Sequence, residues 1–75
     1  MNITVIVDID EDGVYYSYSE DLKGVYGQGD SPEKAFVDFL RGLTCLFESL
    51  LKESKSLNVE TIQVNYNVPT PPITS

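Results

Sequence analysis

The chain has 75 residues, a net charge of −7, one cysteine and no histidine. This length allows one domain at most, one thiol cannot form an intrachain disulfide, and a zinc site lacks ligands. No run approaches the roughly 20 apolar residues of a membrane span, and the N-terminus carries no signal sequence, so we expect a cytoplasmic protein. Because so small a core supplies little net stability, we also expect a homodimer, a higher oligomer or a complex.

The negative charge is concentrated in the first 33 residues, which hold the whole net charge of −7. The acids of this segment are Asp8, Asp10, Glu11, Asp12, Glu20, Asp21, Asp30 and Glu33, against Lys23 as its only base. Such a surface repels phosphate and attracts basic proteins, so we expect a protein partner and no direct nucleic-acid binding. A simpler interpretation, that the charges only keep the domain soluble, stays open.

Two segments near the N-terminus show the alternation of half-buried strands. In residues 2–9 every second side chain is a branched apolar one, and in residues 14–19 every second one is valine or tyrosine. Residues 10–13 lie between them, carry three acids and end in glycine, as a hairpin loop does. The pattern predicts a β-hairpin with a four-residue loop.

The register of this hairpin decides which side chains face the core. With a four-residue loop, Ile9 pairs with Val14, and the apolar residues of both strands then share one face. The open face is predicted to carry Thr4, Ile6, Tyr15 and Ser17. We interpret this partly apolar face as an interaction surface.

A third short strand, residues 25–29, is followed by a helix. Gly27 and Gly29 in this strand indicate a bend or the close approach of another backbone segment. Ser31 can cap the first helical amides, and Pro32 suits the first helical position. Apolar residues then recur at steps of three and four, which predicts an amphipathic helix of about 22 residues.

The end of the chain reads as a fourth strand and a tail. Residues 62–66 alternate again, whereas the prolines of residues 69–75 predict an extended C-terminal tail. The order β-β-β-α-β gives one α+β domain over residues 1–68. A right-handed crossover places the last strand parallel to the first, in a mostly antiparallel four-stranded sheet of order 3-2-1-4 with the helix on one face.

Two stretches of the chain resemble the HicB-like antitoxin family. Residues 12–24 combine an acidic turn with glycine, a tyrosine-rich strand and a loop similar to the family's P-D-L-P-G. Residues 28–35, Q-G-D-S-P-E-K-A, match the family's strand end and acidic helix start, and the likeness extends over residues 1–53. Glu20 and Lys23 replace the two prolines of the loop. The DNA-binding domain of many members is replaced by the tail, so operator binding is not implied.

The resemblance implies a truncated ribonuclease-H-like fold that is not a nuclease and that occludes a small basic, HicA-like toxin, an mRNA-cleaving ribonuclease. An acidic surface suits such a partner. The predicted partner contacts are Asp10, Glu11, Asp12, Tyr15, Glu20 and Asp21. The residues predicted to shape the fold instead are Gly13, Gly24, Gly29 and Ser31. We expect no catalytic residue, no metal and no cofactor.

Other chemistry fits the sequence less well. The run D-I-D-E-D-G from Asp8 opens like a calcium loop, but its twelfth position is Ser19 and its flanks read as strands. Serine or cysteine catalysis lacks a histidine base, and Cys45 is predicted to be a packing residue. Two alternatives stay open: a homo-oligomeric regulatory or structural protein, or inhibitor of another basic enzyme, without a toxin partner; and a divergent nuclease with Asp8 and Asp10 as metal ligands.

Overall fold

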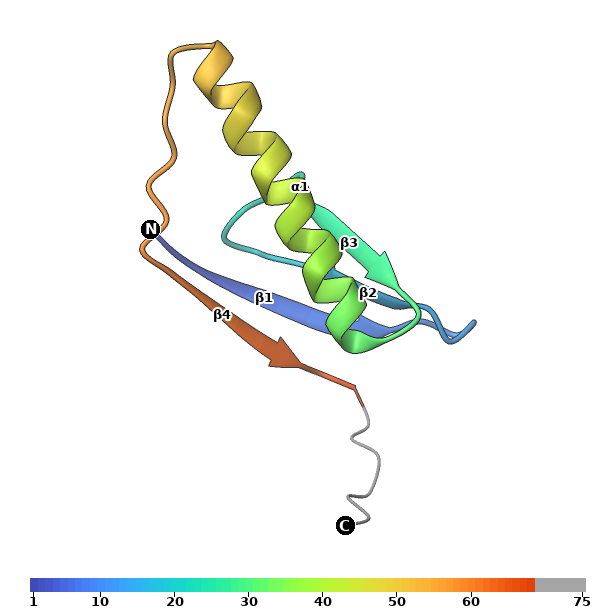
Figure 1. Cartoon of the computed structure of the whole chain (residues 1–75). Helices are drawn as coiled ribbons and strands as arrows, with labels where there is room; N and C mark the ends of the chain where they lie inside the picture. Colours follow the sequence, from blue (N-terminus) through green and yellow to red (C-terminus); the bar gives the residue numbers. More distant parts are fainter. Residues whose placement is uncertain (69–75) are drawn as a thin grey trace.

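The structure, a computed structural model, describes residues 1–68. Its elements are β1 (Asn2–Ile9), β2 (Tyr15–Tyr18), β3 (Tyr26–Gly29), α1 (Pro32–Lys52) and β4 (Thr61–Tyr66). The sheet has the order β3-β2-β1-β4, antiparallel except for the parallel pair of β1 and β4 (Figure 1). The predicted α+β fold and strand order are confirmed. The predicted tail, residues 69–75, lies outside the described residues.

Local signals in the sequence set the start of α1. The Ser31 side chain accepts a hydrogen bond from the Lys34 amide at 3.2 Å, and Pro32 follows as the first helical residue. Glu33 in the first turn and Lys52 in the last turn carry the charges that the helix dipole favours at each end. The helix therefore begins in a fixed position, directly after β3.

The core lies between α1 and one face of the sheet. Its buried cluster consists of Ile3, Val5, Val25, Phe39 and Leu43. Half-buried apolar residues complete it from the helix, from the loop before β3 and from the segment that leads to β4: Leu22, Phe36, Leu46, Phe47, Leu57 and Val59. No helix in residues 1–68 has the length and apolar character that crossing a bilayer requires.

The helix approaches the sheet most closely at β3. A Cβ atom at Gly27 would fall on the Ala35 carbonyl oxygen and the Phe39 amide nitrogen, so only glycine fits there. Ser17 on the neighbouring strand donates a hydrogen bond from Oγ to the Ala35 carbonyl at 2.7 Å. The predicted close approach of another backbone segment is therefore confirmed, and small residues make it sterically feasible.

The predicted hairpin register is wrong by one residue. Ile9 pairs with Tyr15 and Val7 with Ser17, because the loop has three residues, with Asp10 and Val14 already joined by a backbone hydrogen bond of 2.9 Å. Gly13 has φ +82°, as a glycine that ends such a loop requires.

The one-residue difference moves every side chain of β2 to the opposite face. Thr4 and Ile6 lie on the open face, as predicted, but Tyr15 and Ser17 face the helix side. Their places on the open face are taken by Tyr16 and Tyr18. The physical reason is side-chain volume. The site beside Gly27 and Ala35 has room for the small side chain of Ser17 but not for a tyrosine ring.

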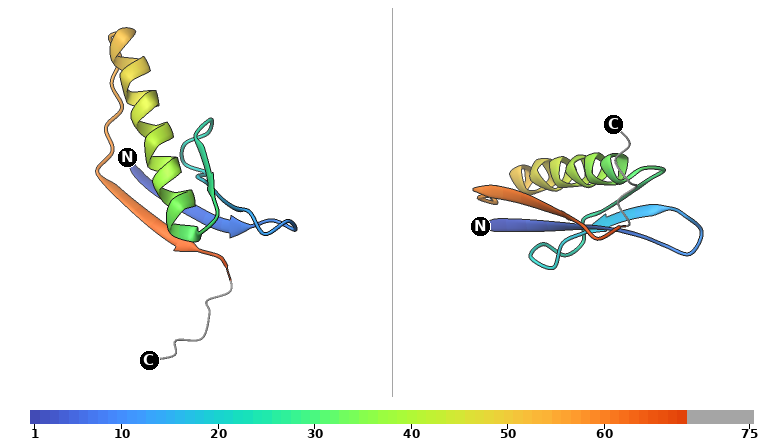
Figure 2. Two further views of the ribbon diagram at one scale, coloured as in Figure 1. Left: turned by 45° about the vertical axis from the view of Figure 1, so that its right-hand side comes forward. Right: turned by 90° about the horizontal axis from the view of Figure 1, so that it is seen from below.

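A single helix leaves much of the sheet uncovered. α1 packs over β3, β2 and β1, with β3 receiving most of the contact, and β4 lies at the margin (Figure 1). On β4, Ile62 and Tyr66 belong to the helix side but remain 40% and 45% exposed. Among residues 1–68, no helix lies on the opposite face of the sheet (Figure 2).

Candidate functional site

The open face of the sheet is rich in tyrosine. Tyr16 and Tyr18 project from β2, and Tyr26 projects from β3 directly opposite Tyr18. The rings of Tyr16 and Tyr18 stack with centroids 6.1 Å apart and planes at 18°, and Tyr26 is 70% exposed. These three rings, which we call the tyrosine face, form a rigid aromatic surface that no other described element covers.

A carboxylate of β1 borders the tyrosine face. Asp8 is the register partner of Tyr16, and its side chain accepts hydrogen bonds from the Ile9 amide at 2.8 Å and from the Asn67 side-chain amide at 3.3 Å. Partial desolvation, together with the negative charge of Asp8, raises the pKa of the Tyr16 phenol. The Tyr16 hydroxyl, which like any tyrosine hydroxyl is protonated at neutral pH, can donate a hydrogen bond.

The acids of the hairpin loop divide into structural and free ones. Asp10 folds the loop, because its Oδ1 accepts hydrogen bonds from the amides of Asp12 and Val14, both at 2.9 Å. Glu11 and Asp12 are exposed and carry their charge at the tip. Of the predicted contacts in this loop, Glu11 and Asp12 are thus available to a partner, whereas Asp10 is held by the turn.

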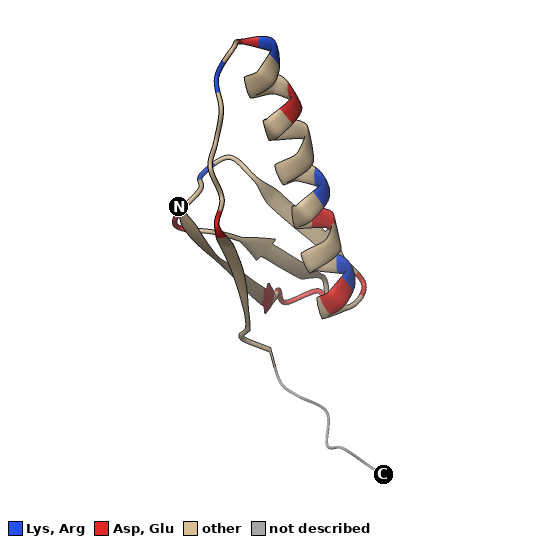
Figure 3. Ribbon diagram, turned by 60° about the vertical axis from the view of Figure 1, so that its left-hand side comes forward, with Lys and Arg blue, Asp and Glu red and all other residues tan. Residues whose placement is uncertain are grey.

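Further acids lie at the same end of the molecule. Tyr15 pairs with Gly29, which brings the end of β3 and the first turn of α1 beside the hairpin loop. Figure 3 shows the red loop next to the red start of the helix. Asp30 and Glu33 therefore join Glu11 and Asp12 in what we call the acidic end, defined by these four residues. Asp30 is partly neutralised by Lys34, whose ammonium lies 3.0 Å from its carboxylate.

The remaining predicted contacts do not lie at the acidic end. Glu20 and Asp21 follow β2 at the opposite end of that strand. Asp21 has a structural bond there, since its Oδ2 accepts the Thr4 amide at 2.9 Å where β2 no longer pairs with β1. Tyr15 is half-buried on the helix side, opposite Gly29. The structure therefore does not bring the six predicted contacts together.

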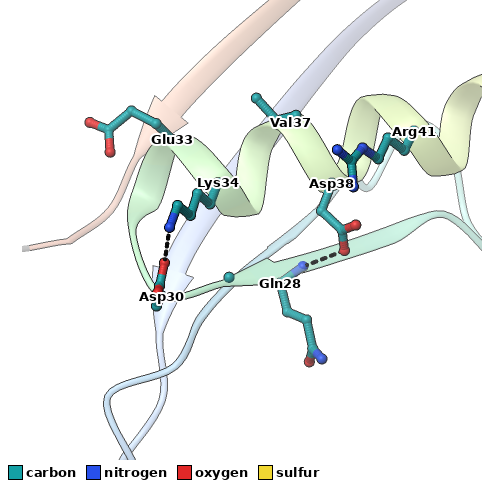
Figure 4. A pocket seen from close by; sticks show the side chains of 8 residues that line it. Gln28, Asp30, Glu33, Lys34, Val37, Asp38 and Arg41 are labelled. Carbon is teal, nitrogen blue, oxygen red and sulfur yellow. Dashed lines mark hydrogen bonds and ion pairs between the residues drawn. The ribbon is translucent and has the colours of Figure 1, made fainter.

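A shallow groove runs between the outer edge of β3 and the first half of α1 (Figure 4). Its lining residues are Gln28, Gly29, Asp30, Glu33, Lys34, Val37, Asp38 and Arg41. Asp38 Oδ2 accepts the outward-facing amide of Gln28 at 2.9 Å, and Lys34 pairs with Asp30. Three charged groups of the groove, Asp30, Lys34 and Asp38, are thus engaged with each other or with the strand edge, and we assign the groove a structural role.

Groups for catalysis are sparse in the described part of the chain. Among residues 1–68, no three His, Cys, Asp or Glu side chains are arranged to hold a metal ion. Asp8 and Asp10, the ligand pair of the nuclease alternative, are both occupied by hydrogen bonds to nearby groups. Cys45 is exposed, so the prediction that it packs is wrong.

The partner contacts predicted from the sequence did not include five residues of the tyrosine face and the acidic end: Tyr16, Tyr18, Tyr26, Asp30 and Glu33. Gly13 was the available signal for the correct hairpin register, since a three-residue loop commonly ends in a glycine with left-handed backbone conformation. Serine at position 17, matched with glycine at position 27 on the next strand, was a second one.

Comparison with known proteins gives two relatives. The chain is 32% identical over 63 residues to the UPF0150 protein ssr1765 of Synechocystis, covering 84% of this chain and 80% of the relative. It is 32% identical over 68 residues to the UPF0150 protein Ta0767 of Thermoplasma acidophilum, covering 87% of this chain and 99% of that protein. No protein-family profile and no solved structure matches the chain.

Proposed function

This chain belongs to the UPF0150 family, and we propose that it acts as a HicB-like antitoxin, a cytoplasmic protein without enzymatic activity that neutralises a small basic, HicA-like mRNA-cleaving toxin by occluding it. One observation carries the proposal: the open face of the sheet bears three tyrosines, of which Tyr16 lies toward the acidic end. The resemblance of residues 1–53 to HicB-like domains supports it further.

The tyrosine face suits a basic partner chemically. Aromatic rings attract Lys and Arg side chains that lie over them, by about 0.5–2 kcal/mol for each contact. Tyrosine also contributes a large contact area with little loss of conformational entropy, and the stacked pair of Tyr16 and Tyr18 is ordered before binding. Asp8 beside Tyr16 supplies a carboxylate for a cation seated on the ring.

The acidic end acts at longer range in this proposal. Exposed charges such as Glu11 and Asp12 raise the encounter rate with a basic protein and add modestly to affinity. Because they are solvent-exposed, their effect falls with rising salt. In this proposal the tyrosine face supplies most of the binding affinity, and the acidic end raises the association rate.

The proposal predicts a gene for a small basic protein next to the gene for this chain, and the test is a binding measurement with that protein. We expect a complex at low salt that weakens as salt increases, and inhibition of RNA cleavage by the basic protein within that complex. Tyr26→Ala should weaken binding about 10-fold or more, as loss of an interface aromatic commonly does. Leu51→Ala, a change at an equally exposed residue on the far end of α1, is the control and should bind like the wild type.

Charge reversal separates the two surfaces. Glu11→Lys combined with Asp12→Lys should reduce the association rate while leaving dissociation almost unchanged. Glu20→Lys, at the opposite end of β2, should have a smaller effect. If the two proteins elute separately at low salt, or if Tyr26→Ala binds normally, the proposed function is wrong.

A second candidate function is a homo-oligomeric regulatory or structural protein, or an inhibitor of another basic enzyme, without a toxin partner. The uncovered β4 strand favours self-association independently of any toxin. An isolated gene without a small basic neighbour would support this alternative.

A further inference from the structure

The β4 edge of the sheet has an unpaired backbone and no protecting device within the described residues. β4 pairs with β1 alone, and its sequence, T-I-Q-V-N-Y, contains no charged residue and no proline. Natural edge strands usually carry lysine, proline, a bulge or a covering element, because a bare edge adds further strands. An uncharged edge is conspicuous in a chain of net charge −7.

The direction of one hydrogen bond fixes which residues of β4 face outward. The Asn67 amide donates to the Val7 carbonyl of β1 at 2.7 Å. Successive residues of a strand turn their backbone groups to alternate sides, so the amides and carbonyls of Ile62, Val64 and Tyr66 face away from β1. These same residues bear the apolar side chains of the strand on the helix side.

We propose that a second copy of this chain pairs with β4 in antiparallel orientation, about a two-fold axis at Val64. In this register Val64 faces its own copy, and Ile62 faces Tyr66 of the partner subunit. All three outward-facing residues then exchange both backbone hydrogen bonds with an outward-facing residue of the other chain. A register centred on Gln63 or Asn65 pairs only two of the three within the strand, so the Val64 register is favoured.

The side chains of Ile62 and Tyr66 also favour the register centred on Val64. The pairing joins Ile62 to an aromatic ring across the interface, a combination that stabilises antiparallel strands. It also covers side chains that are 40% and 45% exposed in the single chain, Ile62 and Tyr66. The isologous symmetry repeats each contact, so every favourable pair other than the axial one occurs twice.

Charge identifies a second copy as the occupant. Glu60, the acid next to β4, is engaged by its own chain: its amide donates to the Met1 carbonyl at 2.9 Å, and its carboxylate lies 3.7 Å from the N-terminal ammonium. No acid then faces an acid across the strand pair, although both copies are strongly acidic. A basic partner would instead be drawn to the acidic end and the tyrosine face, which this dimer leaves open.

The inference goes beyond the proposed function and is tested on the chain alone. Sedimentation equilibrium over a range of concentrations should give twice the 8.4 kDa mass of the chain, falling to a single mass on dilution. Hydrogen exchange measured by NMR should find the amides of Ile62, Val64 and Tyr66 protected in the dimer and unprotected in the monomer. Because no other protein is present, failure here says nothing about toxin binding.

Two variants and a matched control locate the interface. Ile62→Glu should weaken dimerisation about 10-fold or more, because symmetry places the uncompensated charge at the interface twice. Val64→Pro removes an outward-facing amide and leaves the hydrogen bonds to β1 in place, so it should give a folded monomer. Val37→Glu, the same apolar-to-acid change at a 49% exposed residue beside β3, should dimerise like the wild type.

Each other outcome overturns the proposal. If the chain keeps the mass of a monomer at every concentration, the β4 edge does not pair with a second copy. A dimer that tolerates Ile62→Glu, or one in which the three outward amides exchange freely, would place the interface elsewhere. Should either variant lose its circular-dichroism spectrum, the other variant and the exchange data decide the question.

Discussion

The two edge strands of the sheet, β3 and β4, differ in how far their outward-facing backbone groups are covered. On β3, the Gln28 amide is capped by Asp38 from the helix, and Gly27 allows α1 to lie directly against the strand. On β4, neither a helix of the described chain nor a charged side chain of the strand itself protects the edge, and Ile62 and Tyr66 are partly exposed.

The difference between the two edges arises because one helix cannot cover all four strands of the sheet. Ser17, Gly27 and Ala35 draw α1 toward β3, since their small size permits a close backbone approach. A helix placed there cannot also cover β4. Within residues 1–68, the chain's own helix protects the β3 edge but not the β4 edge.

The largest effect is expected from a substitution that prevents α1 from packing closely against β3, which removes the difference between the two edges. Gly27→Ala places a Cβ within 2.5 Å of Ser17 Oγ and onto backbone atoms of α1. We expect a loss of about 3 kcal/mol or more, at the upper end for overpacking, which is a large part of the stability of a small domain. Chemical denaturation followed by circular dichroism measures it.

Gly13→Ala is the control for this substitution. Its site has φ +82° and open space around it, so the cost is backbone strain of about 1–2 kcal/mol without a clash. Equal losses for the two variants would contradict the close approach at β3.

The next largest effect tests the register of β2. Ser17→Val adds volume beneath α1 and removes the hydrogen bond to Ala35, which should cost about 1–3 kcal/mol. Tyr16→Val, on the open face of the same strand, should change stability by less than about 1 kcal/mol. The register first predicted from the sequence requires the reverse order, so thermal denaturation of the two variants distinguishes them.

The sequence predicted the elements of the fold correctly but the register of β2 incorrectly. Alternation within the strands and the helix start signals at Ser31 and Pro32 are local, and together with the right-handed crossover rule they predicted the elements and the strand order. The face of β2 depended on the space under α1, which is set by Ala35, 18 residues away from Ser17. Hydrophobicity alone placed the tyrosines inside, because it carries no information about volume.

The candidate site was predicted less completely for a related reason. Counting acids along the chain grouped the hairpin loop with Glu20 and Asp21, which fold to the other end of β2. Asp30 and Glu33 join the hairpin loop only through the pairing of β2 with β3. Charge is readable from the sequence, but its distribution over the surface requires the strand register.

A smaller effect concerns the cap on the β3 edge. Asp38→Ala leaves the Gln28 amide without its acceptor, which should cost about 1 kcal/mol because water replaces the lost bond. It should also expose β3 to pairing, giving species larger than the dimer in sedimentation. Asp38→Asn keeps an acceptor oxygen and is expected to stay close to the wild type in both measurements. Larger species in neither variant would mean that Asp38 does not protect this edge.

The smallest effect comes from the ion pair at the end of β3. The hydrogen bond from Lys34, and then its positive charge, lower the pKa of Asp30 below its ordinary value of 3.8. A carboxyl whose pKa falls on folding stabilises the native state above its unfolded pKa, and this contribution is lost as the pH falls through the folded value. Because both side chains are exposed, the contribution is small and is screened by salt.

Lys34→Met makes this contribution measurable. The variant should be slightly less stable than the wild type at neutral pH, and the difference should shrink as the pH falls below about 4, where Asp30 becomes protonated. The same comparison in an Asp30→Asn background should give almost no pH-dependent difference. A difference that grows in acid would mean that Lys34 acts through packing on the groove instead of through its charge, and the β3 edge would then depend on Asp38 and Gly27 alone.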